Sequence, residues 1–83
     1  MTAHTPEQIQ QIVNEILGKL DRTEFKDCAM NWGDLRCFEA RRFENGQWYI
    51  LIEEAAADEW RLQRAVCDSL LARGIEAIVH TEW

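Results

Sequence analysis

The chain has 83 residues, of which 47% are hydrophobic, and a formal charge of −6 from 15 acidic and 9 basic side chains. This length predicts one domain, residues 1–83, and the apolar content excludes a globally disordered chain. The acidic balance disfavours direct binding to nucleic acid, because such binding depends on Lys and Arg side chains that neutralise phosphates. We therefore expect a small soluble protein, and a partner with a basic surface fits its charge.

The cysteine content and the absence of long apolar runs indicate the cellular compartment in which the protein is expected. The three cysteines, Cys28, Cys37 and Cys67, are an odd number without a CxxC pair, which favours free thiols in a reducing compartment. No apolar run approaches the roughly 20 residues that cross a bilayer. The first residues also lack the basic and apolar regions of a signal peptide. We therefore expect a cytoplasmic protein that makes no membrane contact.

The first predicted element is a helix over residues 5–21. Thr5 and Gln8 form the pattern of a capping box, and Pro6 suits the first helical position. Apolar residues then recur at the spacing of one helical stripe: Ile9, Ile12, Val13, Ile16, Leu17 and Leu20. Residues 22–34 have no clean period, and a short strand near 26–31 is the prediction there.

Two further strands, over residues 35–43 and 47–53, are predicted to form a hairpin around Asn45-Gly46. Asn and Gly tolerate positive φ angles, which a two-residue type I′ turn requires at both central positions. Such a turn fixes the pairing of the two strands, because register follows from the turn type.

The predicted register places Phe43 opposite Trp48 and divides the hairpin into two faces. One face then carries Phe38, Ala40, Arg42, Tyr49 and Leu51. The other carries Arg41, Phe43, Trp48, Ile50 and Ile52, interrupted by Glu39. Both faces are therefore partly apolar, which is typical of a strand pair covered on both sides.

A second helix is predicted after Asp58, followed by a last strand over residues 75–81. Asp58 is the expected N-cap, with Glu59 in the first turn. The helix has an inner apolar stripe that is widened on one side: Leu62, Ala65, Val66, Ser69 and Leu70, with Trp60, Cys67 and Leu71 beside them. Gly74 is predicted to end the helix in a left-handed conformation, with Ile75 contacting Leu70.

The order helix, strand, strand, strand, helix, strand predicts an α+β fold of two layers. Two helices would pack on one face of a mixed sheet with three or four strands. The unit from 47 to 81 is a strand-helix-strand pattern, which predicts two parallel strands with a right-handed crossover. In topology alone, this arrangement is similar to a ferredoxin-type split βαβ unit that lacks its first strand.

The residues that could take part in catalysis or bind a metal indicate such a function only weakly. Carboxylates gather where a strand meets the second helix, at Glu53, Glu54, Asp58 and Glu59, and could serve acid–base catalysis. Capping and the helix dipole explain such acids more simply. Cys37 follows Arg36 and is a candidate reactive thiol. Cysteine and histidine spacings match no zinc template, and the isolated glycines form no phosphate loop. We expect no metal and no cofactor, and an enzyme is the less favoured function.

The remaining functional signal is the hairpin face that carries Arg41, Phe43, Trp48, Ile50 and Ile52. Aromatic residues and Arg are enriched in protein interfaces, although residues 22–34 could equally cover this face as core. We expect an interaction or regulatory module that acts by protein–protein binding, as a homodimer through the sheet face or an edge strand. Two alternatives stay open: an acidic inhibitor that blocks a basic nucleic-acid-binding partner, and a small enzyme or ligand-binding subunit that uses the carboxylates or a cysteine.

Overall fold

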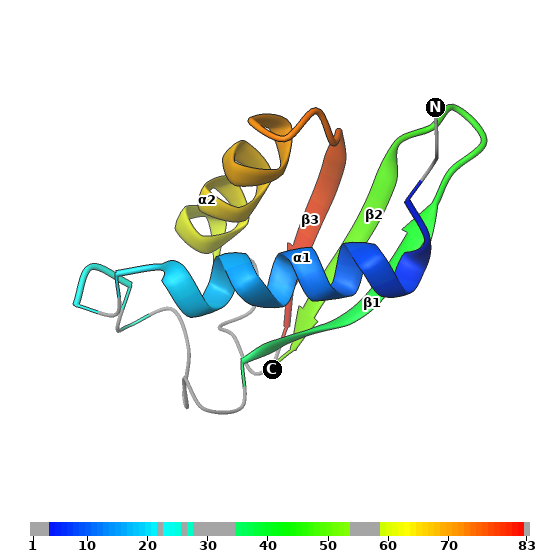
Figure 1. Cartoon of the computed structure of the whole chain (residues 1–83). Coiled ribbons are helices and arrows are strands. Elements are labelled where there is room, and N and C mark those ends of the chain that lie inside the picture. The colour runs from blue at the N-terminus through cyan, green and yellow to red at the C-terminus, as the bar shows by residue number, and fades with distance from the viewer. Residues whose placement is uncertain (1–3, 22, 26, 28–34, 54–58, 83) are drawn as a thin grey trace.

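The computed structural model describes residues 4–21, 23–25, 27, 35–53 and 59–82, which form two helices and a three-stranded sheet (Figure 1). In chain order the elements are α1 (Pro6–Lys19), β1 (Arg36–Arg42), β2 (Trp48–Glu53), α2 (Trp60–Leu71) and β3 (Ala77–Thr81). The predicted α+β class is confirmed. The strand predicted near 26–31 falls on residues of which only 27 is described.

Helix α1 begins as its local sequence predicts. The Gln8 backbone N–H donates to Thr5 Oγ1 at 3.2 Å, and the Thr5 backbone N–H donates to Gln8 Oε1 at 2.9 Å. These two bonds form the capping box and satisfy amides that a helix start leaves without partners. Ile9 and Val13 are fully buried in the stripe that faces the sheet.

The sheet has β2 at its centre, antiparallel to β1 on one side and parallel to β3 on the other. The parallel pairing confirms the strand-helix-strand prediction, with α2 as the crossover. Figure 1 shows α1 crossing the sheet and α2 beside β3. Side chains from both helices and from one sheet face form a single core: Ile9, Val13, Ile16, Leu17, Cys37, Ala40, Trp48, Ile50, Ile52, Leu62, Val66, Leu70 and Ile75. The helices therefore cover one face of the sheet.

The hairpin turn has three loop residues, so the predicted two-residue turn is wrong. Phe43 N–H donates to the Gln47 carbonyl at 2.8 Å, and Gly46 N–H donates to the Phe43 carbonyl at 3.0 Å. Gly46 has a φ of 88°. These bonds and this angle are those of a type I turn followed by a glycine bulge, which Asn-Gly supports as readily as a type I′ turn.

The extra loop residue shifts the register by one, with Arg42 opposite Trp48 and Ala40 opposite Ile50. A shift of one residue exchanges the faces of every side chain on one strand relative to the other. Arg41 therefore lies opposite Tyr49, and the predicted sharing of one face by Arg41 and Trp48 is wrong.

A second irregularity lies in β1, where the register shifts between Cys37 and Glu39. The Cys37 backbone N–H donates to Asn14 Oδ1 of α1 at 2.8 Å, and Gln10 Nε2 of α1 donates to the Phe38 carbonyl at 3.2 Å. Two α1 side chains thus satisfy backbone groups that the bulge removes from the ladder.

The start of α2 is anchored to the end of β3. Its N-cap is Glu59 rather than the predicted Asp58, which lies outside the described residues. The Glu59 backbone N–H donates to Thr81 Oγ1 at 2.9 Å, and Gln63 Nε2 donates to the same atom at 3.1 Å. Thr81 is fully buried, and these bonds satisfy its hydroxyl oxygen.

The end of α2 follows the prediction. Gly74 has a φ of 77°, Gly74 N–H donates to the Leu71 carbonyl at 2.9 Å, and Ile75 N–H donates to the Leu70 carbonyl at 3.0 Å. This pair of bonds is the Schellman motif. Ile75 is buried in the core with Leu70, so the predicted termination at Gly74 is confirmed.

Replacing Gly46 by Ala tests the turn. A Cβ at this φ is strained, so we expect Gly46→Ala to lower the free energy of unfolding by about 1–2 kcal/mol. Gly18→Ala is the matched control, because a methyl group at this position in α1 meets open space and should raise the free energy of unfolding by about 0.5–1 kcal/mol. Urea denaturation measures both, and equal stability of Gly46→Ala and the wild type would contradict the turn.

Candidate functional site

The structure separates the five predicted interface residues. Arg41 and Phe43 lie on the sheet face that the helices do not cover, whereas the other three lie in the core beneath the helices: Trp48, Ile50 and Ile52. The register shift is the reason, because it exchanges the faces of β1 relative to those of β2 and so places Arg41 and Phe43 on the face opposite to Trp48. The predicted five-residue surface is therefore not brought together.

The open face of the sheet is partly covered by its own side chains. The Arg41 guanidinium lies 5.4 Å from the centre of the Tyr49 ring, and the Phe43 ring lies 6.3 Å from it. Leu51, the next residue of β2 on this face, is 9% exposed. Tyr49 and Leu51 therefore offer little apolar surface here, although Phe43 remains 38% exposed and Ile78 of β3 48% exposed.

The predicted acidic patch is only partly described, since Glu54 and Asp58 lie outside the described residues. Glu53 Oε2 lies 3.6 Å from Arg36 Nη2. Glu59 Oε1 accepts hydrogen bonds from the backbone N–H of Arg61 at 3.2 Å and from its Nε at 3.1 Å. The two described carboxylates thus each have a cationic partner, and one of them caps α2.

Cys37 does not have the environment of a reactive thiol. It is buried beneath the helices, and burial raises the pKa of its thiol from 9.0 to about 11. A reactive cysteine requires a lowered pKa and access for the reagent. Cys67 is half-buried, and Cys28 lies outside the described residues. In the described ranges, no three His, Cys, Asp or Glu side chains are grouped as metal ligands would be.

The raised pKa makes the contribution of Cys37 to stability depend on pH. The folded protein keeps this thiol neutral to a higher pH than the unfolded chain does, so its contribution is complete below pH 9.0 and is lost as the pH rises to about 11. The difference in unfolding free energy between the wild type and Cys37→Ala should therefore shrink over this interval. Urea denaturation across that pH range measures it, and a constant difference would contradict the buried neutral thiol.

The two large apolar side chains that α2 exposes lie in one line along its outer side. Trp60 is 63% exposed and Leu71 58% exposed, with Arg64 and Cys67 between them. We call these four residues the outer stripe. The sequence predicts that Trp60, Cys67 and Leu71 widen the inner stripe. At about 100° per residue Trp60 and Leu71 instead point away from the buried side chains of the helix. Cys67 lies between these two sides, since it is half-buried and its Sγ donates to the Ala77 carbonyl of β3 at 3.4 Å.

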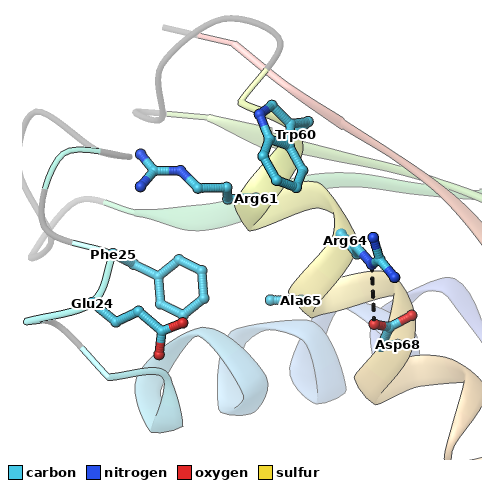
Figure 2. Close-up of a pocket in the computed structure, with 7 residues that line it drawn as sticks. All are labelled: Glu24, Phe25, Trp60, Arg61, Arg64, Ala65 and Asp68. Carbon is cyan, nitrogen blue, oxygen red and sulfur yellow. Dashed lines mark ion pairs between the residues drawn. The ribbon is translucent and has the colours of Figure 1, made fainter.

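An open hollow borders the outer stripe on each side. The first, of about 430 Å³, lies between α2 and the segment that contains Phe25, whose ring points toward Ala65 (Figure 2). The second, of about 380 Å³, lies between α2 and β3 and includes Ile78. Trp60 and Arg64 line both hollows. The outer stripe therefore forms a ridge between two depressions, a shape that can pack against the ridges of another helix.

Charged side chains follow the edge of the ridge that borders Phe25. Arg64 Nε lies 3.8 Å from Asp68 Oδ2, and these side chains are 75% and 69% exposed (Figure 2). Arg61 lies one turn before Arg64 and pairs with Glu59. Exposed ion pairs contribute little to stability, so Arg64 and Asp68 can form pairs with another molecule at small cost.

Comparisons with protein-family models, with curated proteins and with solved structures gave no match. In the described part of the chain, neither helix has the length and apolar content that crossing a bilayer requires. The function is therefore argued from the geometry of the exposed surface. The signal for the outer stripe is present in the sequence, as the spacing of four, three and four residues from Trp60 to Leu71.

Proposed function

We propose that this protein is a protein-binding module that docks through the outer stripe of α2. The observation that carries the proposal is the alignment of Trp60 and Leu71, both more than half exposed, on one side of a single helix. Covering two large apolar side chains with a partner removes them from water, which favours association by about 25 cal/mol for each Å² of apolar surface. Trp and Arg are also the residue types most enriched at binding hot spots.

The open sheet face supports this function less well. Arg41 lies over the Tyr49 ring, and Leu51 is buried, so much of the apolar surface there already has intramolecular contacts. Trp60 instead stands between two hollows that a partner could fill. The expected docking surface therefore moves from the hairpin to α2.

The charges of this surface favour a protein partner with both signs of charge. Arg61 and Arg64 lie on the same edge as Asp68, in a chain whose net charge is −6. An inhibitor that occupies a basic nucleic-acid channel would dock with an acidic surface, which the outer stripe does not provide. The buried Cys37 thiol likewise gives no support to a cysteine-dependent enzyme.

A photoreactive residue at the ridge tests the docking surface. We expect p-benzoyl-phenylalanine in place of Trp60 to form covalent adducts with protein when irradiated in the native host, since the partner would lie against this position. The same residue in place of Gln11, which is exposed on α1, is the matched control and should form few adducts. Gel mobility and mass spectrometry identify the adducts.

The yield of covalent adducts at position 60, compared with that at position 11, decides this proposal. Adducts at position 60 alone, with one other protein or with a second copy of this chain, support the outer stripe as the docking surface. Equal labelling at the two positions, or no adduct at either, would show that α2 does not dock a protein.

A further inference from the structure

We infer that the partner of the outer stripe is a second copy of this chain, with the two α2 helices antiparallel. Asp68 of each copy then lies between Arg61 and Arg64 of the other. This inference rests on the proposed docking surface and names its occupant. It is carried by the charge pattern along α2 and by the spacing of the outer stripe, in which Trp60, Arg64 and Leu71 are exposed and Cys67 is half-buried.

The spacing of the outer stripe suits a pair of helices. Its members follow at intervals of four, three and four residues, which is the alternation that places side chains along the seam between two packed helices. In one antiparallel register, Trp60 lies opposite Leu71 of the second copy and Arg64 lies opposite Cys67. This register uses all four residues, whereas sliding the helices by one heptad leaves Trp60 or Leu71 without a counterpart.

Charge selects the antiparallel direction. In a parallel pair each Asp68 would lie at the level of the other Asp68 and about one turn from Arg64 of the second copy, whereas the antiparallel register brings Asp68 within one residue of that Arg64. The two Arg64 side chains would lie at the same level in the parallel pair and three residues apart, about 4.5 Å along the axis, in the antiparallel pair. In an antiparallel pair related by a two-fold axis, the same edge of both helices lies on the same side of the contact. Arg61, Arg64 and Asp68 of both copies are therefore brought to one edge.

The register places opposite charges next to each other along that edge. Asp68 of the second copy falls within one residue of the level of Arg64, about 1.5 Å along the axis, and within two residues of Arg61, about 3 Å. The symmetry repeats these contacts at the other end of the helix. Each Asp68 thus lies close to Arg61 and Arg64 of the second copy. It can keep its ion pair with Arg64 of its own helix, at 3.8 Å, or replace that pair by one across the contact.

The contact is small, which sets the expected affinity. Helix α2 has 12 residues and is about 18 Å long. Two such helices bury less area than a stable obligate dimer requires, even where Trp60 and Leu71 fill the hollows of the opposite copy. We therefore expect a weak dimer, with a dissociation constant in the micromolar range or above.

Charge reversal followed by mixing tests the arrangement. Arg61→Asp places two acidic side chains together in the dimer, and Asp68→Arg places three cations together, so each variant alone should dimerise at least about tenfold more weakly than the wild type. Mixed in equal amounts, the two variants should associate more tightly than either alone, because Asp68 of one chain again meets Arg61 and Arg64 of the other. Sedimentation equilibrium measures the association.

Matched controls change the charge by the same amount on α1. Lys19 and Glu15 are exposed there, so the variants Lys19→Asp and Glu15→Arg should dimerise as the wild type does. Circular dichroism confirms that all variants are folded. Rescue by mixing, with unchanged controls, supports the antiparallel pair.

Other results overturn the inference in distinguishable ways. If the wild-type protein stays monomeric at about 1 mM while position 60 still crosslinks to another protein, the partner is not a second copy, but the outer stripe remains the docking surface. If neither Arg61→Asp nor Asp68→Arg weakens dimerisation, the antiparallel arrangement is wrong. It is also wrong if the mixed variants associate no more tightly than either variant alone. A monomer without any adduct at position 60 removes both proposals.

Discussion

The left-handed conformation of Gly46 decides which side chains of the hairpin lie beneath the helices. With Gly46 as the third loop residue, Arg42 pairs with Trp48, and the alternation along β2 then places Trp48, Ile50 and Ile52 in the core. A two-residue loop would keep the same residues in β2 but pair them with the other face of β1. One φ angle therefore determines how the two strands share a core face, and hence what the sheet can offer to a partner.

The bulge in β1 also determines which side chains of this strand lie in the core. Strict alternation from Ala40 would turn Phe38 toward the helices, but the extra residue brings Cys37 into the core and leaves Phe38 half exposed. The small Cys37 side chain leaves room for α1, whose Asn14 and Gln10 bind the backbone at the bulge. The packing of α1 and the irregularity of β1 thus depend on each other.

The sequence predicts best those features that a few neighbouring residues decide. The capping box at Thr5 and the helix end at Gly74 are each formed by residues within six positions of one another, and both are confirmed. The turn at Asn45-Gly46 is correctly located, but its predicted type is wrong because Asn-Gly fits loops of two and of three residues. The bulge at Phe38 depends on contacts with α1, which lies more than twenty residues earlier. The misassigned faces of the hairpin follow from these limits, whereas the exposed side of α2 could have been predicted from the spacing of Trp60, Arg64 and Leu71.

Helix α2 has two faces with different roles, one in the core and one that exposes Trp60 and Leu71. The most direct test of this view is to record backbone amide NMR spectra as the protein is diluted from about 1 mM to the low micromolar range, in which such a small contact dissociates. The proposed dimer predicts shifts at residues 60–71, with little change at Glu39, Arg41 and Tyr49 on the open sheet face. Shifts confined to the sheet, or spectra that do not depend on concentration, would contradict it.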